Sequence, residues 1–393
     1  MNIKDQNNNF QGSKLKTARI FRGFTLEDLE EKLGISHQSI SNYENDKAHP
    51  DLEMLKKIAN ILEFTPSFFY ATDTEILKPE TSHFFRSGAA VAVKYKNRVK
   101  EKIKIIAYII DFIQSKMKLP YFTYPNFIKR YSEFRQYDLE EIDEIATQLR
   151  RYIGLGDGPI NNITALCERL GIIISFAEME DEKIDACTVF YKGRPYIILN
   201  QEKISSVRLR FNIAHELGHI LLHSNYNEKD VKDKSKHKRI EQEANRFASA
   251  FLMPESTIVP ELSSAGLDYL LLLKEHWKVS VQAIIYRAEE LGIYTPDYAL
   301  YLRQQISRKK WRLREPLDDT IPIEKPLLLK QAFRLLVEKN NLSVEEISFK
   351  TGLTISELSQ LSDRELQISE EYSLTEDNKN NLVYLNSKTR KYS

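Results

Sequence analysis

Two histidines and one glutamate lie within the stretch Asn212–His223, which has the sequence NIAHELGHILLH. On a helix, His215 and His219 differ by about 40° in azimuth, so both side chains leave one face and can bind the same metal ion. Glu216 lies about 100° further round, where its carboxylate can meet a water molecule on that metal. The pattern His-Glu-x-x-His therefore predicts two imidazole ligands and a general base.

A catalytic zinc ion takes three protein ligands and keeps one open position, so a third ligand is needed. The segment RIEQEANRFASAFLMPE places Glu241 and Asn245 four residues apart on one helical face. We expect Glu241 to be the third ligand and Asn245 to orient a ligating histidine by a hydrogen bond. Glu243 points elsewhere and is the weaker candidate. The alternative is an amphipathic core helix, but burying two histidines and a glutamate without partners is costly.

This arrangement predicts hydrolysis by a zinc-activated water, with Glu216 taking the proton from that water and passing it to the leaving amine. An additional oxyanion donor is needed, and the residues leave three candidates open: His223, Tyr226 and Arg208. His223 also lies roughly on the metal face, but its spacing does not fit the three-histidine zinc pattern. We expect it to pack at the end of the helix.

The elements that must position these residues are short strands and helices. The β-branched runs GIIISF (171–176) and PYIILN (195–200) predict two buried strands. A helix around His215, a charged surface loop over 227–239 and a second helix over 240–252 follow.

The segments RLRFNIAHELGHILLH and EQEANRFASAFLMPE resemble the ImmA/IrrE family of metallo-endopeptidases, and the preceding IDACTVFYKGRPYIILN is similar to its lead-in. The resemblance covers roughly residues 150–300. It implies a small gluzincin-like α+β domain that binds zinc through His215, His219 and Glu241, with Glu216 catalytic. In this family the peptidase often accompanies an XRE module and cuts a repressor, which implies a regulatory protein as the substrate.

The N-terminal segment 24–62 predicts two short helices joined by a tight turn at Gly34, capped by Thr25 and Ser36. Two such helices form a helix-turn-helix, whose second helix enters the major groove of DNA. The residues expected near base edges are His37, Gln38, Ser39 and Asn42. The residues expected near phosphates are Lys14, Lys16, Arg19, Arg22 and Lys47. A helical hairpin that serves only packing is the alternative.

The stretch LKTARIFRGFTLEDLEEKLGISHQSISNYENDKAHPDLEMLKKIANIL resembles the XRE (Cro/phage-repressor-like) family. The resemblance implies a double-stranded DNA operator as the partner. Such modules commonly act as dimers on two half-sites, so a homodimer is expected. The family commonly has Gln after the Thr that opens the first helix of the motif, and here that position is Leu26. This departure leaves room for weaker DNA binding or for protein contacts.

The segment LSVEEISFKTGLTISELSQL (342–361) echoes the N-terminal motif, because Ser343 precedes Gly352 by the same nine residues that separate Thr25 from Gly34. It is either a second helix-turn-helix or a helical hairpin docked on the peptidase domain or on a partner. Its candidate recognition helix carries Glu357 and little positive charge, which suits phosphates poorly. We therefore favour the docked hairpin.

Composition sets the remaining bounds. A chain of 393 residues suits two or three domains. With 57 Lys and Arg against 56 Asp and Glu, any nucleic-acid surface must be local. Two cysteines fit a reducing cytosol better than a disulfide framework, and no segment is apolar enough to span a membrane. We expect a cytoplasmic protein without membrane contacts.

The predicted fold is mixed and mainly α: an N-terminal all-α helix-turn-helix domain, a central α+β gluzincin-like metallopeptidase domain and a small helical C-terminal segment. The expected divisions are 14–72, a helical connecting region 73–150, the peptidase domain 151–308, and 309–393 as linker, helical segment and polar tail. We expect a DNA-binding regulator fused to a zinc-dependent endopeptidase. The alternative is a non-proteolytic regulator, or an antitoxin-like protein that binds a toxin and uses the peptidase fold for binding or sensing.

Overall fold

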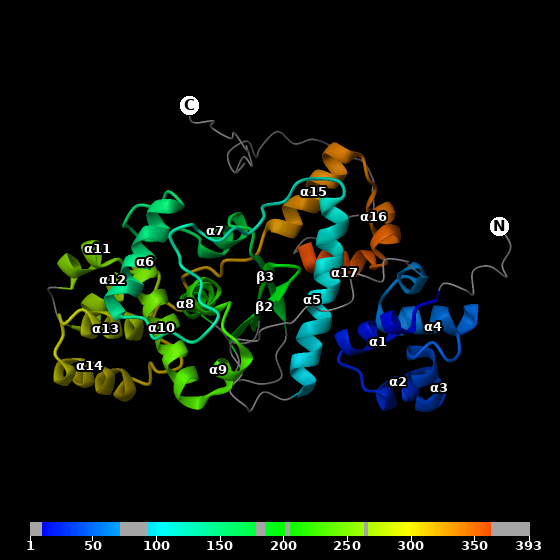
Figure 1. Ribbon diagram of the computed structural model, residues 1–393, viewed down its shortest axis with the longest axis horizontal. Coiled ribbons are helices and arrows are strands. Elements are labelled where there is room, and N and C mark those ends of the chain that lie inside the picture. Colours follow the sequence, from blue (N-terminus) through cyan, green and yellow to red (C-terminus); the bar gives the residue numbers. More distant parts are fainter. Residues whose placement is uncertain (1–9, 71–92, 178–184, 201–204, 263–265, 363–393) are drawn as a thin grey trace.

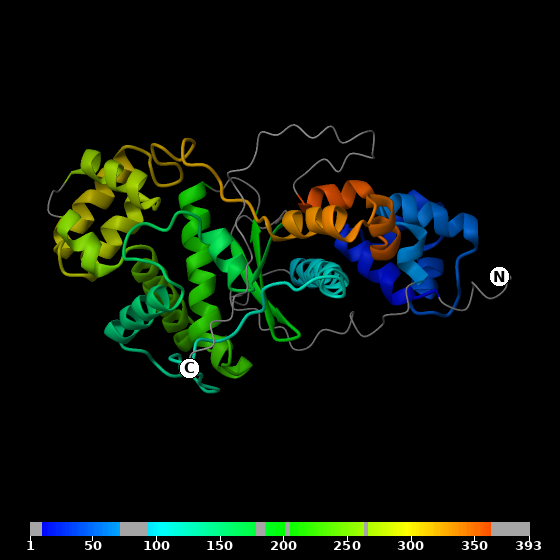
Figure 2. The ribbon, with the colours of Figure 1, turned by 90° about the horizontal axis from the view of Figure 1, so that it is seen from above.

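The computed structural model of the chain describes residues 10–70, 93–177, 185–200, 205–262 and 266–362. These residues form an elongated molecule with the helix-turn-helix domain at one end, a small sheet near the middle and a group of short helices at the other end (Figures 1 and 2). The predicted mixed, mainly helical fold is confirmed. The expected polar tail after residue 362 lies outside the described residues.

The N-terminal domain contains four α-helices and a short 3₁₀ helix. They are α1 (Gly12–Phe21), α2 (Leu26–Leu33), α3 (His37–Glu44), α4 (Leu52–Leu62) and η2 (Pro66–Tyr70). Thr25 and Asp28 form a reciprocal capping box at the start of α2, and Ser36 caps α3. Gly34 has a φ of 71°, which permits the tight turn between α2 and α3 without steric cost. The predicted helix-turn-helix is therefore present.

Helix α5 (Val93–Gln114) connects this domain to the sheet. One hydrophobic cluster includes core residues of the N-terminal domain, Ile106 and Ile110 of α5, and Val189 and Ile198 of the sheet. Helix α5 is apolar on more than one side, so it can pack against several elements at once. It therefore connects the core of the N-terminal domain to the sheet.

The sheet has three strands: β1 (Ile173–Ala177), β2 (Ala186–Tyr191) and β3 (Arg194–Asn200). Strand β3 lies in the middle, parallel to β1 and antiparallel to β2. The two predicted strands are confirmed, and β2 is an addition to the prediction. Residues of β3 alternate between the two faces: Ile198 packs towards α5, and Ile197 and Leu199 pack towards α8 and α10.

Helices α7 (Ile163–Arg169) and α8 (Ser206–Gly218) pack against the sheet, and α8 continues into the π-helical turn η4 (His219–His223) (Figure 1). Helix α10 (Lys234–Leu252) packs across α8, and α6 (Leu139–Tyr152) and α9 (Glu228–Lys232) pack against α10. The expected charged loop at 227–239 is wrong: it contains α9 and the start of α10. Asn227 and Asp233 cap these helices. The charged side chains of 227–239 therefore lie mostly on the surfaces of α9 and α10 and not on a loop.

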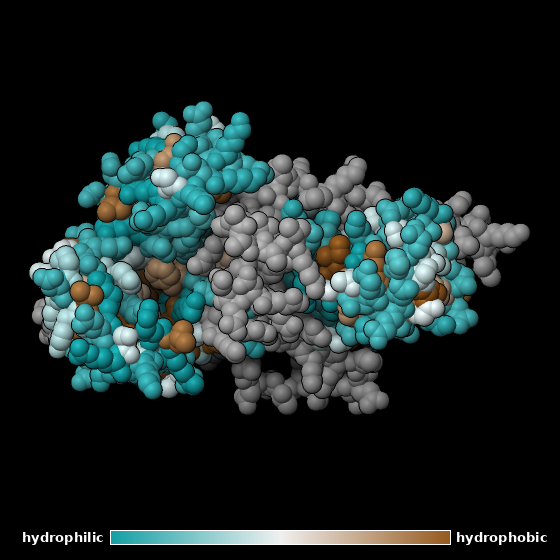
Figure 3. Space-filling view, turned by 90° about the horizontal axis from the view of Figure 1, so that it is seen from below, coloured by the Kyte–Doolittle hydropathy of each residue, from teal (hydrophilic) through white to brown (hydrophobic). Residues whose placement is uncertain are grey.

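Four short helices complete this end of the molecule: α11 (Glu255–Glu261), α12 (Leu267–Trp277), α13 (Val281–Glu290) and α14 (Pro296–Arg308). Residues 309–327 then return towards the sheet without helix or strand. They are anchored by buried carboxylates, because Glu315 pairs with Lys274 at 2.9 Å and Glu324 pairs with Arg210. Figure 3 shows a largely hydrophilic surface with small, separate hydrophobic areas. Among the described residues, no helix is long and apolar enough to cross a membrane.

The C-terminal helices are α15 (Leu328–Asn340), α16 (Val344–Thr351) and α17 (Ile355–Ser362). Ser343 caps α16, and Gly352 turns the chain with a φ of 70°, as Gly34 does in the first motif. The hairpin docks on the N-terminal domain and not on the peptidase domain: Thr65 N donates to Gly352 O at 2.9 Å. Glu357, which suits phosphates poorly, is buried against Arg22 at 2.8 Å.

Candidate metal centre

Helix α8 and the turn η4 place His215 and His219 together, with their Nε2 atoms 3.0 Å apart. Helix α10 packs across α8 at Gly218, where a Cβ would lie 3.3 Å from Ala244 Cα and 3.1 Å from Phe247 Cδ1. A glycine at this position therefore lets the two helices approach closely. That approach brings Glu241 on α10 to the two histidines.

The three candidate ligands converge on one point. Glu241 Oε2 lies 3.5 Å from His215 Nε2, and Glu241 Oε1 lies 3.3 Å from His219 Nε2. Tetrahedral zinc with bonds of about 2.0–2.1 Å holds neighbouring ligand atoms about 3.3 Å apart. The distances between the side chains are thus those that a zinc ion requires.

The protonation of the two imidazoles gives an independent test of this fit. Asn245 Oδ1 lies 2.8 Å from His215 Nδ1 and can only accept, so that Nδ1 carries the proton. Glu243 Oε2 lies 3.0 Å from His223 Nε2 and also can only accept. His223 Nδ1 is then an acceptor, and His219 Nδ1, 3.0 Å away, must donate to it. Both Nε2 atoms are left with lone pairs that face each other beside a carboxylate, an arrangement that calls for a cation.

Burial supports the same state. Desolvation, followed by the neighbouring His215, lowers the pKa of His219 to about 4. The imidazole is therefore neutral near pH 7, which is the form that binds a metal.

His223 contacts a candidate metal ligand, a role that the sequence did not reveal. We expected it to pack at a helix end, and it is fully buried there, but it also contacts the candidate ligand His219. Its partner Glu243 is held in turn by Tyr137 N at 3.0 Å and Arg239 Nε at 2.9 Å. The helix has π geometry at His219–His223, a feature often found at functional sites.

Glu216 is fully buried beside the sheet. Its Oε2 accepts a hydrogen bond of 2.7 Å from Thr188 Oγ1 on β2. Its Oε1 has no hydrogen-bond partner among the described residues. A buried carboxylate oxygen left in this way is suited to accept a proton from a water molecule. Thr188 was not singled out from the sequence, because its strand is distant along the chain.

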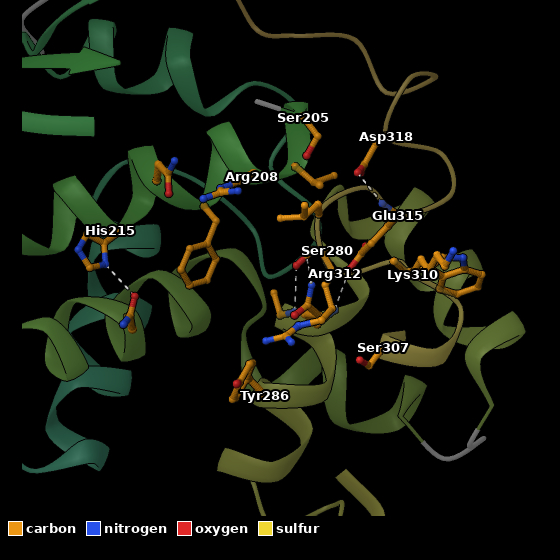
Figure 4. Close-up of a pocket in the computed structure, with 18 residues that line it drawn as sticks. Ser205, Arg208, His215, Ser280, Tyr286, Ser307, Lys310, Arg312, Glu315 and Asp318 are labelled. Carbon is orange, nitrogen blue, oxygen red and sulfur yellow. Dashed lines mark hydrogen bonds between the residues drawn. The ribbon is translucent and has the colours of Figure 1, made fainter. Parts of the chain in front are cut away.

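A pocket of about 880 Å³ opens beside His215 (Figure 4). Arg208 and Asn245 line it together with His215. Of the three oxyanion candidates, Tyr226 is buried and donates its hydroxyl proton to Arg135 O at 2.9 Å, and His223 is engaged as described. Arg208 is the candidate that faces the pocket, where it also pairs with Asp185 at 2.7 Å.

The candidate DNA-contacting residues lie on α3. His37 and Gln38 are exposed, and Ser39 and Asn42 are half-buried. His37 Nδ1 lies 2.9 Å from Glu30 Oε2, and Gln38 Nε2 lies 3.4 Å from Asn42 Oδ1. The structure thus leaves the start of α3 open to a partner.

The expected phosphate contacts are partly wrong. Lys14 is buried against the rings of Phe68 and Tyr108. Arg19 is buried in a two-bond pair with Glu44, at 2.5 and 2.9 Å, and Arg22 pairs with the C-terminal hairpin. These side chains hold the fold together. The two other candidates, Lys16 and Lys47, are exposed.

Comparison with known families agrees with both resemblances. Residues 15–69 match a helix-turn-helix model, and residues 167–289 match the IrrE N-terminal-like domain of the M78 peptidases. The HTH-type transcriptional regulator ImmR of Bacillus subtilis is 36% identical over 70 residues, which are 18% of this chain and 55% of ImmR. The SPbeta prophage-derived uncharacterized HTH-type transcriptional regulator YonR of the same organism is 39% identical over 57 residues, 14% of this chain and 53% of YonR.

The chain thus spans about half the length of these two curated relatives. A Mycobacterium tuberculosis transcriptional regulator of known structure aligns over 38% of this chain and 46% of its own, with 15% identity and a TM-score of 0.29, too low to establish a common fold. The chain thus contains a segment, residues 15–69, that matches the helix-turn-helix family, and a second segment, residues 167–289, that matches the IrrE N-terminal-like domain of the M78 peptidases.

Proposed function

We propose that this protein binds an operator in double-stranded DNA and cuts a regulatory protein, such as a repressor, with a zinc ion held by His215, His219 and Glu241. The observation that carries the proposal is the convergence of the Nε2 atoms of His215 and His219 and one carboxylate beside a pocket. Residues 14–72 would supply DNA binding and residues 151–308 hydrolysis. The protein would act as a homodimer in the cytoplasm, since helix-turn-helix modules commonly bind two half-sites.

Zinc, when bound there, lowers the pKa of a water molecule towards about 7 and polarises the scissile carbonyl. Glu216 Oε1 takes the proton of the attacking water, and Glu216 then returns it to the leaving amine. Thr188 holds the other carboxylate oxygen at 2.7 Å, which fixes the orientation of Glu216. Asn245 and His223 fix the two imidazoles from behind. Arg208 supplies the positive charge for the oxyanion from the pocket wall.

On DNA, Gln38 and Asn42 would read base edges, and His37 and Ser39 would contact neighbouring edges or the backbone. These side chains lie on the exposed side of α3. Lys16 and Lys47 would contact phosphates. The helix α3 itself carries no Lys or Arg, so we expect affinity to depend strongly on dimer formation.

The test compares the wild type with Glu216→Gln, using Glu255→Gln on exposed α11 as the matched control. We expect about one zinc per chain in all three proteins, because Glu216 is not a ligand. Cleavage of candidate helix-turn-helix repressors should fall by about 10²- to 10⁴-fold in Glu216→Gln alone. Equal cleavage by Glu216→Gln would refute the role of that residue, and absence of zinc would refute the metal centre.

A non-proteolytic regulator or antitoxin-like protein gives a different result. It would hold zinc, bind its operator or a toxin, and show no cleavage in either the wild type or the variant. Both curated relatives are named as transcriptional regulators, which supports this second candidate function.

A further inference from the structure

The pocket beside His215 extends well beyond the candidate metal centre. Its walls come from the exposed side of α8, the first half of α13 and residues 310–318 (Figure 4). Figure 4 shows His215 at one end and Lys310 at the other, with Arg312 between them, and Asn245 contacts His215 at 2.8 Å. A polypeptide whose scissile bond lay at the metal would therefore place its neighbouring residues in this pocket.

The free charge of the pocket is positive. Lys310 and Arg312 are exposed, and neither has an ion-pair partner among the residues that the structure describes. The carboxylates of the wall are already engaged. Glu315 and Asp318 pair with the buried Lys274 at 2.9 and 2.5 Å.

Glu315 also accepts hydrogen bonds from Val281 N and Gln282 N at the start of α13. Its charge is thus neutralised by a lysine and by the positive end of a helix. Glu315 and Asp318 therefore have a structural role in the wall. Lys310 and Arg312, unpaired among the described residues, make the electrostatic potential of the pocket positive.

Aromatic side chains alternate with these charges. Phe211 and Trp311 are half-buried, and Tyr286 is 54% exposed. All three line the pocket. Rings that remain accessible in a concave surface offer contact area to apolar side chains of a ligand.

We propose that this pocket binds the substrate polypeptide on one side of the scissile bond and selects a segment with Asp or Glu next to an aromatic or aliphatic residue. The inference rests on the proposed peptidase function, and it adds the substrate class. A peptide fits better than a nucleic acid, because two free cations beside engaged carboxylates make a local site and not a track for a phosphate backbone. The pocket shares His215 and Asn245 with the candidate metal centre, so a segment bound in the pocket would lie next to the proposed site of reaction.

The test uses fluorescent peptides of one sequence that differ only in two positions beside a leucine, filled with Glu, Gln or Lys. Binding is measured by anisotropy with full-length Glu216→Gln protein, and hydrolysis with the wild type. We expect the Glu peptide to bind about three- to thirtyfold more tightly than the Lys peptide, with a preference that falls as salt is added. The double variant Lys310→Glu/Arg312→Glu should invert the order.

The matched control is Arg308→Glu/Lys339→Glu, which makes the same change of net charge on exposed residues that do not line the pocket. It should keep the preference for the Glu peptide. Equal binding of the three peptides, or no binding, would overturn the inference, as would an unchanged order in Lys310→Glu/Arg312→Glu. Equally tight binding of a single-stranded oligonucleotide of similar length would also overturn it.

The two proposals fail separately. Hydrolysis of all three peptides at one rate would leave the peptidase function standing and remove the selectivity. Selective binding that inverts in the charge-reversed variant, without hydrolysis, would remove the peptidase function and keep the pocket.

Discussion

His223 lies directly behind His219, with their Nδ1 atoms 3.0 Å apart, and it links that candidate ligand to the buried carboxylate of Glu243. Neither residue belongs to the ligand set. Together they fix the tautomer of His219 and direct its Nε2 atom towards Glu241. Partners behind metal-binding histidines contribute strongly to metal affinity in other proteins.

The first prediction concerns this support. His223→Ala removes the acceptor of the His219 proton, so zinc affinity should fall by about 10- to 100-fold in a protein that remains folded. His223→Gln keeps an acceptor oxygen and should lose less. The measurement is competition with a chelator, with folding checked by circular dichroism. His276→Ala, on an exposed histidine of α12, is the control and should leave affinity unchanged. If folded His223→Ala bound zinc as tightly as the wild type, His223 would not contribute to metal binding through His219.

The second prediction concerns the general base. Thr188→Val removes the hydrogen bond to Glu216 Oε2 but keeps the shape of the side chain. Since a hydrogen bond to a charged group contributes about 1.5–3 kcal/mol, kcat should fall about tenfold or more, with little change in KM. Thr188→Ser keeps the hydroxyl and should retain most of the activity. The measurement is steady-state kinetics on one cleaved substrate. Equal kcat values for Thr188→Val and Thr188→Ser would contradict the proposal that Thr188 orients Glu216.

The sequence predicts the parts of this site that depend on helical periodicity. The shared face of His215 and His219, and the face of Glu241 and Asn245, follow from spacing within single helices. Thr188 and Glu243 could not be assigned, because their partners lie on other elements and the packing of those elements determines the contacts. Tertiary packing also explains why Lys14 is buried, although its position in the sequence looks like a phosphate contact.

The same reasoning explains the C-terminal hairpin. Its turn geometry could be predicted from Ser343 and Gly352, because capping and positive φ are local properties. Its docking surface could not, because the matching groups Thr65 and Arg22 lie near the other end of the chain.

The third prediction separates folding from DNA binding. Arg19→Ala leaves Glu44 buried without its partner, so the N-terminal domain should lose about 3–5 kcal/mol of unfolding free energy. Lys47→Ala, at an exposed position, should leave stability unchanged. It should instead weaken operator binding and reduce the salt dependence by about one unit of slope. Urea unfolding and binding titrations at several salt concentrations measure the two effects. Equal stability of the two variants would contradict the assignment of Arg19 to the fold.

The fourth prediction tests the docking of the C-terminal hairpin through two glycines with the same backbone. Gly34 and Gly352 have φ values of 71° and 70°. A Cβ at Gly34 meets nothing within 4 Å, but one at Gly352 would lie 2.5 Å from Phe68 Cβ and 2.6 Å from Phe68 Cα. Gly34→Ala therefore introduces only backbone strain, about 1–2 kcal/mol. Gly352→Ala adds a clash with a neighbouring backbone that cannot move aside without displacing the hairpin.

We expect Gly352→Ala to lower the unfolding free energy by more than Gly34→Ala does, and to speed hydrogen exchange at the Thr65 amide, which donates to Gly352 O. Gly34→Ala should leave that amide protected, because its strain lies in the turn between α2 and α3. Equal loss of stability in the two variants, with Thr65 protected in both, would mean that the hairpin tolerates a side chain at this contact. Because the two positions share their backbone conformation, the difference between the variants isolates the contribution of docking from that of the turn.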